Sequence, residues 1–111
     1  VFSSNYVIVK GNYLQNQKAL VGSHDQYGIL TYAKKSVINQ NLITGYNATN
    51  NSYGILLGFG DNFITNNTMS DNSTAVFVSG ATYYVKNQAE KNIFLQNKNI
   101  VIPKRYLLQW M

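Results

Sequence analysis

Short runs in which apolar and polar residues alternate recur along the whole chain, separated by turn residues. One pattern, an apolar residue, two polar or small residues, Asn, any residue and a second apolar residue, recurs at regular intervals, with spacings of 29, 26 and 25 between the Asn residues Asn12, Asn41, Asn67 and Asn92. A second apolar pattern lies between these, with spacings of 26, 21 and 24 between Ile29, Ile55, Val76 and Ile100. Alternation predicts strands. A period of about 25 residues predicts a repeat architecture in which successive units stack.

Each repeat holds at least two such runs, which are cut by Gly, Asn, Ser and Asp. No sustained helical stripe precedes the last eight residues. The pattern therefore predicts an all-β fold, a parallel β-helix of about four coils over residues 1–102. We expect the four repeated Asn residues at tight bends, in the left-handed conformation. Their amides are predicted to form a structural ladder from coil to coil.

The blocks Ile38–Ile43, Tyr53–Leu56 and Ile64–Met69 carry a resemblance to the right-handed parallel β-helix repeat proteins of the pectin-lyase-like group. The resemblance covers roughly residues 5–102 and implies a right-handed coil. It identifies the fold better than the function, because the group includes polysaccharide lyases and hydrolases, phage tailspikes, surface adhesins and periplasmic copper-delivery proteins. Either Ala89 or Val85 could lie opposite Ile64 in the next coil, and we prefer Ala89 because it keeps Asn92 in the pattern.

The chain starts at Val1 without a basic or apolar leader, so we expect a mature product or a piece of a longer protein. No run approaches the roughly eighteen apolar residues that a membrane span needs. Pro103 ends the last coil, and residues 103–111 form an apolar tail. We expect this tail to be a cap on the last coil or an interface segment.

The second pattern predicts a row of apolar residues on the outside of the coil. If Ile29, Ile55, Val76 and Ile100 point inward, their neighbours must point outward. These neighbours are Leu30, Leu56, Phe77 and Val101. A parallel sheet that is apolar on both faces is normally covered on both faces. We therefore predict an interface here, with identical copies, another domain or the tail, which favours a subunit of an oligomeric fibre or spike.

Few residues are suited to catalysis or metal binding. There is no Cys and a single His, so we expect no metal site and no other cofactor. His24 beside Asp25 is predicted to be a solvated pair. Glycoside hydrolysis needs two carboxyls within about 5 to 9.5 Å, but Asp25, Asp61, Asp71 and Glu90 fall at different places in the repeats. No catalytic residue is assigned and an enzyme is disfavoured, although another chain could complete an active site.

The composition favours an extracellular, cell-surface or virion-surface protein. The chain has a net charge of +5 but only 12% charged residues, with sixteen Asn and nine Tyr. Asn-x-Ser/Thr sequons make glycosylation candidates of Asn47, Asn50, Asn66 and Asn72, although an Asn-rich repeat produces sequons by chance. Tyr and Asn suit polysaccharide binding, while Tyr is also a good strand residue. The scattered basic residues do not form the patch that nucleic acid requires.

These observations predict a non-catalytic extracellular or surface structural or adhesive module that binds glycans. We expect it to be a homo-oligomer or part of a larger parent chain. The alternative is a fragment of a pectin-lyase-like polysaccharide lyase or glycoside hydrolase. Two acidic side chains that converge in one groove would favour the alternative.

Overall fold

The computed structural model describes residues 5–16, 25–49, 51–79, 87–102 and 107–109, the last three and residues 101–102 by backbone alone. This part of the chain contains strands and turns and no helix, which confirms the all-β prediction. It therefore holds no helix that is long and apolar enough to cross a membrane.

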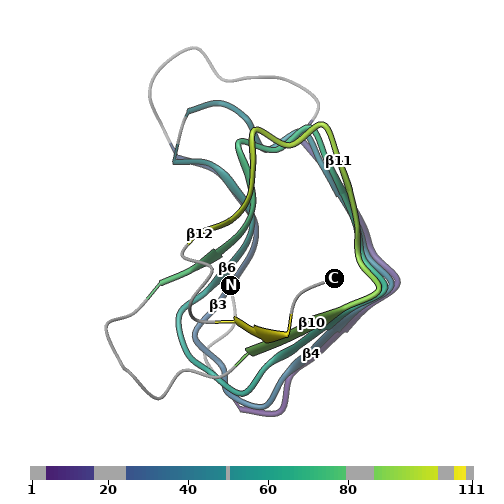
Figure 1. The fold of residues 1–111 in the computed structure, drawn as a ribbon, viewed down its shortest axis with the longest axis vertical. Coiled ribbons are helices and arrows are strands. Elements are labelled where there is room, and N and C mark those ends of the chain that lie inside the picture. The colour runs from purple at the N-terminus through teal and green to yellow at the C-terminus, as the bar shows by residue number, and fades with distance from the viewer. Residues whose placement is uncertain (1–4, 17–24, 50, 80–86, 103–106, 110–111) are drawn as a thin grey trace.

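The strands form three parallel sheets. The first sheet contains β1 (Ile8–Lys10), β4 (Val37–Asn39), β7 (Phe63–Thr65), β10 (Asn87–Glu90) and β13 (Leu107–Gln109). The second contains β2 (Tyr13–Gln15), β5 (Leu42–Thr44), β8 (Thr68–Ser70) and β11 (Ile93–Leu95). The third contains β3 (Tyr27–Thr31), β6 (Tyr53–Leu57), β9 (Thr74–Val78) and β12 (Asn99–Ile102). Because the chain visits the three sheets in turn, each coil contributes one strand to each, and the result is a right-handed parallel β-helix of about four coils (Figure 1).

The register of the first sheet agrees with the preferred alignment. Ile38 pairs with Val9 on one side and with Ile64 on the other. Ala89 is the next partner of Ile64, so the alternative with Val85 in that place is wrong. Beyond residue 102, β13 pairs with β10 in an irregular register, so the predicted tail adds one strand to this sheet.

The predicted register of the last coil in the third sheet is wrong by one residue. Ile55 pairs with Ile29 and Val76 as expected, but Val101 pairs with Val76 in place of Ile100. Ile100 is 42% exposed and does not point inward. Val101 consequently leaves the predicted outward row, because Ile102 is the residue opposite Phe77.

The core is a set of inward columns, one from each sheet. Ile38 and Ile64 fill the first sheet, Ile43 and Met69 the second, and all four are at most 1% exposed. The third sheet adds several more residues, including Ile29, Ile55, Leu57, Val76 and Val78. Stacking places like side chains on like in successive coils, so that each coil buries its neighbour's apolar surface.

Among the described residues, a residue in the left-handed conformation makes each bend, and at the first ladder it precedes the Asn predicted for that role. Gln40 has φ 58° and is followed by Asn41, while Asn66 has φ 55° and is followed by Asn67. The repeated Asn residues themselves do not have positive φ, so that part of the prediction is wrong. The left-handed residue turns the chain, and the next side chain is then buried, as Asn41 is at 2% exposure.

Replacing a left-handed bend residue with glycine should stabilise the protein. Gln40 is exposed and its left-handed backbone costs an L-residue about 1 to 2 kcal/mol, which glycine avoids at a smaller entropic cost. We expect Gln40→Gly to raise the free energy of unfolding by about 0.5 to 1 kcal/mol in urea titrations. The control Gln88→Gly, inside β10, should lower it by a similar amount. Equal destabilisation by both variants would contradict the assignment of strain to Gln40.

Candidate functional site

The structure brings the four predicted ladder residues together at the bend between the first and second sheets. The backbone N–H of Asn12 donates to Asn41 Oδ1, that of Asn41 to Asn67 Oδ1, and that of Asn67 to Asn92 Oδ1, each at 2.9 Å. The side-chain Nδ2 of the same donor residue reaches the same oxygen at 3.0 to 3.1 Å. This first ladder, Asn12–Asn41–Asn67–Asn92, thus links all four coils.

In the second, third and fourth coils, the second hydrogen of the ladder amide is donated to a carbonyl of the preceding coil. Asn67 Nδ2 donates to Ile38 O at 2.8 Å, and Asn92 Nδ2 donates to Ile64 O at 2.8 Å. Asn67 is 0% exposed. A buried amide with all its polar atoms paired stabilises the bend, whereas the same group without partners would destabilise it.

Two further ladders occupy the other bends, and the sequence analysis missed both. In the second ladder, Ser36 N donates to Asn62 Oδ1 at 2.9 Å and Asn62 N to Asn87 Oδ1 at 3.0 Å. In the third ladder, Tyr46 N donates to Asn72 Oδ1 at 3.0 Å and Asn72 N to Asn97 Oδ1 at 3.1 Å. The sequence did contain a signal for these two ladders, because their residues lie five positions before or five positions after Asn41, Asn67 and Asn92.

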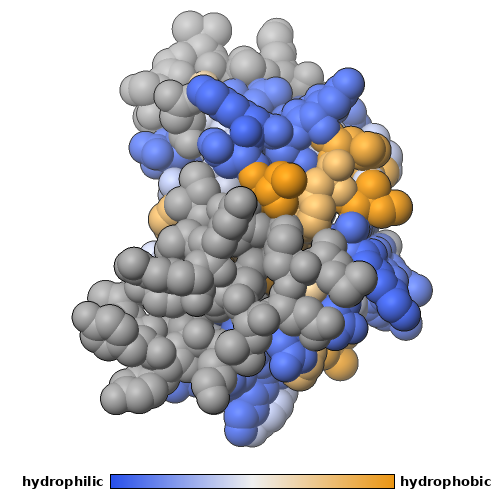
Figure 2. All heavy atoms as spheres, in the orientation of Figure 1, coloured by the Kyte–Doolittle hydropathy of each residue, from blue (hydrophilic) through white to orange (hydrophobic). Residues whose placement is uncertain are grey.

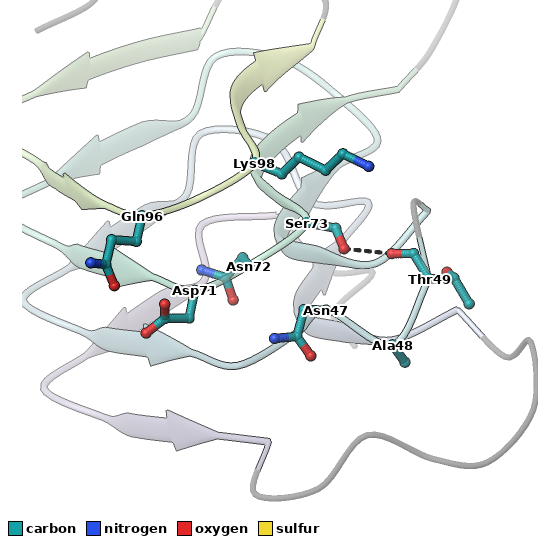
Figure 3. Close-up of a pocket in the computed structure, with 8 residues that line it drawn as sticks. All are labelled: Asn47, Ala48, Thr49, Asp71, Asn72, Ser73, Gln96 and Lys98. Carbon is teal, nitrogen blue, oxygen red and sulfur yellow. Dashed lines mark hydrogen bonds between the residues drawn. The ribbon is translucent and has the colours of Figure 1, made fainter.

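A polar cleft opens beside the third ladder, at the start of the third-sheet strands. It has a volume of about 540 Å³ and is lined by Asn47, Ala48, Thr49, Asp71, Asn72, Ser73, Gln96 and Lys98 (Figure 3). Three coils contribute to it, because residues 47–49 precede β6, residues 71–73 precede β9, and Gln96 and Lys98 precede β12. Of these residues, the sequence analysis had singled out Asn47 and Asn72 as sequons and Asp71 as a carboxyl.

Hydrogen bonds hold the wall of the cleft in place. Ser73 Oγ donates to the carbonyl oxygen of Thr49, the contact drawn as a dashed line in Figure 3. Thr49 Oγ1 donates to Asp25 Oδ1 at 2.9 Å, and Thr49 N donates to Ser52 Oγ at 3.2 Å. The segment that closes the cleft is therefore fixed to the next coil by Ser73 and to the previous coil by Asp25.

The lining suits a ligand rich in hydroxyl groups. Asn47 and Gln96 offer amides, Thr49 and Ser73 hydroxyls, and Asp71 and Lys98 opposite charges. Asp61 lies in the bend before β7 and Glu90 ends β10, so both belong to other bend regions than Asp71. Among the described residues, no three His, Cys, Asp or Glu side chains gather as a metal site. These amides, hydroxyls and charges can donate hydrogen bonds to a bound ligand and accept them from it.

An aromatic row runs next to the cleft, across the outer face of the third sheet. The ring centroids of Tyr27 and Tyr53 are 5.7 Å apart, and those of Tyr53 and Phe77 are 4.7 Å apart. Burial raises the pKa of Tyr53, with smaller contributions from Tyr27 and from the charge of Asp25. Asp25 thus acts on both features, because it also accepts the hydrogen bond from Thr49 in the wall of the cleft. Tyr27 ends the row and is 38% exposed.

The predicted outward row is not a bare apolar face. Leu30 and Phe77 are half-buried, and Leu56 is only 8% exposed in the single chain. Tyr53 stacks against Phe77 on this face. Val101 belongs to a different column, as its pairing with Val76 requires. The chain itself therefore covers much of the surface that was expected to need a partner.

The sequons differ in access. Asn47 and Asn66 are exposed, whereas Asn72 is 2% exposed and its Nδ2 donates to Ile43 O and Asn97 Oδ1. The folded protein therefore offers no free amide nitrogen at Asn72 for glycosylation. Asn50 and His24 lie outside the described residues.

The fold and its ladders define this chain as a parallel β-helix protein. The model of one family, described as "Protein of unknown function (DUF1565)", matches residues 1–107, and the chain belongs to that family. No curated protein and no solved structure matches the chain.

A substitution inside the first ladder should lower the free energy of unfolding more than a substitution at its end. Asn67→Leu removes an acceptor for Asn41 and a donor to Ile38, so it leaves buried groups unpaired at about 1 to 3 kcal/mol each. We expect a loss of about 3 kcal/mol in the free energy of unfolding for Asn67→Leu and about 1 kcal/mol for Asn12→Leu, the exposed end of the ladder. Equal losses in urea titrations would contradict the ladder's role.

Alkaline pH should destabilise the protein in part through Tyr53. Its folded pKa is raised above 10.0, so folding favours the neutral phenol. This contribution is fully present below pH 10.0 and is lost as the pH rises through the raised pKa. Tyr53→Phe should therefore show a smaller fall in the free energy of unfolding above that pH. An unchanged fall in Tyr53→Phe would assign the effect to other groups, such as Tyr46, whose pKa burial also raises.

Proposed function

We propose that this chain is a non-catalytic structural or adhesive module of an extracellular, cell or virion surface that binds polysaccharide along the outer face of its third sheet. The observation that carries the proposal is the polar cleft beside the aromatic row. Sugars combine apolar ring faces with hydroxyl groups. Aromatic rings suit the first and amides, hydroxyls and charges suit the second.

The arrangement of carboxyls supports a binding role over hydrolysis. The sequence has four acidic residues, and two of them, Asp61 and Glu90, lie in other bends and do not line the cleft. Asp71 lines the cleft, while Asp25 is engaged by Thr49. The alternative, a fragment of a pectin-lyase-like lyase or hydrolase, would use Asp25 and Asp71 together with groups from another chain. Depolymerisation of a polysaccharide by the purified chain would favour that alternative.

The surface composition supports the proposed location. Sixteen Asn and nine Tyr accompany a charged fraction of only 12%. In the proposal the module is a subunit or part of a fibre or spike, and the stacked coils provide a stiff rod that displays the cleft. Mass measurement of the intact assembly from its natural source would test the fibre directly.

Polysaccharide binding is testable by affinity electrophoresis through gels that contain neutral or acidic polysaccharides. We expect retardation by at least one polysaccharide. Tyr27→Ala should weaken binding by about 2- to 10-fold, because a ring contact contributes about 0.5 to 1.5 kcal/mol. Tyr13→Ala is the matched control, since Tyr13 also begins a short strand of the first coil but lies on the second sheet.

A second pair of variants tests the cleft. Asn47→Ala removes a lining amide and should weaken binding, whereas Asn51→Ala, an exposed residue of the same segment outside the lining, should not. Equal effects within either pair, or no retardation of the unmodified chain by any polysaccharide, would contradict the proposal.

A further inference from the structure

The two ends of the second sheet carry exposed apolar side chains. Its order places β11 at one edge and β2 at the other, so among the described strands each has one unpaired side. Ile93 is 54% exposed and Leu95 52%, where β8 of the preceding coil has Thr68 and Ser70 at the paired positions. Figure 2 shows the resulting apolar group over β11. An exposed apolar edge strand is a site of association unless something covers it.

The two ends of the first ladder are complementary to each other. Asn12 lies in the first coil of the described residues, and its Oδ1 accepts no hydrogen bond from them. Asn92 Oδ1 is used by Asn67, but the backbone N–H of Asn92 has no acceptor in the described part of the chain. Placing β2 of a second copy on β11 would bring the Asn12 oxygen to that N–H. The new bond would repeat the 2.9 Å step that joins Asn12, Asn41, Asn67 and Asn92 within the chain.

β13 occupies the position that a second copy needs on the first sheet. The strands β1 and β2 belong to one coil, so a copy that places β2 on β11 would also place β1 on β10. β13 already pairs there. Its pairing is irregular, with a register shift between Asn87 and Gln88, whereas β1 pairs with β4 without a shift. At this end of the stack, the edge strand β11 of the second sheet is therefore unpaired among the described strands, whereas β10 of the first sheet is paired with β13.

We infer that the C-terminal end of the coil stack is a docking surface for the N-terminal end of a second copy, and that β13 blocks it. Removal of β13 from β10 allows head-to-tail stacking, in which sheets and ladder continue from copy to copy. The contact is the coil-to-coil contact already present within the chain, with Tyr13 of one copy beside Ile93 of the next. This inference does not depend on polysaccharide binding.

Proline in β13 tests the block in the full-length chain. Leu107→Pro with Gln109→Pro removes backbone N–H groups and prevents strand pairing, whereas Leu107→Ala with Gln109→Ala retains them. We expect the molar mass from light scattering to rise with concentration for the proline variant alone. Adding Ile93→Lys and Leu95→Lys to the proline variant should return the mass to that of the unmodified chain. Phe63→Lys, which is 44% exposed in β7, an inner strand of the first sheet that lies between β4 and β10, should not.

Three outcomes would overturn the inference. The proline variant could stay folded by circular dichroism yet keep the mass of the unmodified chain. It could associate equally well with lysine at Ile93 and Leu95. It could unfold, in which case the single variant Gln109→Pro takes its place, and unfolding of that variant too would mean that β13 is required for folding and is not a removable cover.

Crosslinking tests the geometry of the stack, because the chain contains no Cys. Chains with Tyr13→Cys are mixed with chains with Ile93→Cys, both in the proline background. We expect a disulfide between the two kinds of chain, and none when β13 is unmodified. Equal crosslinking among chains that carry only Tyr13→Cys would contradict the head-to-tail arrangement.

Discussion

The hydrogen bonds of backbone N–H groups at the bends are the constraint on which the rest of the structure depends. Where the chain leaves one sheet for the next, its backbone donors lose their strand partners and must find others. An Asn side chain in the next coil supplies the acceptor, as Asn67 does for Asn41. A left-handed residue before Asn41, and another before Asn67, turns the chain so that the amide is buried. The burial of the backbone donors, the left-handed turns at the bends and the stacking of the coils therefore depend on one another.

The ladders fix two sides of the coil and leave the third side to vary. In the second, third and fourth coils the second ladder, first ladder and third ladder residues are five positions apart, as Asn62, Asn67 and Asn72 are. The spacings of 29, 26 and 25 along the first ladder therefore differ only in the stretch that holds the third sheet and its flanking segments. The cleft and the aromatic row both lie on this side, where length and side chains change without breaking a ladder. Binding residues are expected on such segments, positioned by a rigid scaffold.

The periodicity of the sequence was sufficient for the fold and for the first ladder, since Asn12, Asn41, Asn67 and Asn92 stand between apolar residues that mark their places. The third ladder was missed because Asn72 has no apolar residue two positions after it. Asn62 does stand between Phe59 and Ile64, but the second ladder was missed because the corresponding residue of the preceding coil is Ser36. Val101 was misplaced for a related reason. It lies four residues after Asn97, as Val76 lies four after Asn72, and the ladder rather than the nearest apolar residue sets the register. The cleft could not be predicted, because residues from three coils meet there through a segment whose shape depends on Ser73, Thr49 and Asp25.

Residue-resolved hydrogen exchange of the native protein measures the central claim most directly. The backbone N–H groups of Asn41 and Asn67 donate to ladder oxygens inside the stack, so they should exchange slowly, near the rate of global unfolding. The N–H of Asn92, which has no acceptor among the described residues, should exchange much faster. Exchange of Asn41 and Asn67 as fast as that of Asn92 would contradict the account, because the ladder would then not be what holds the bends.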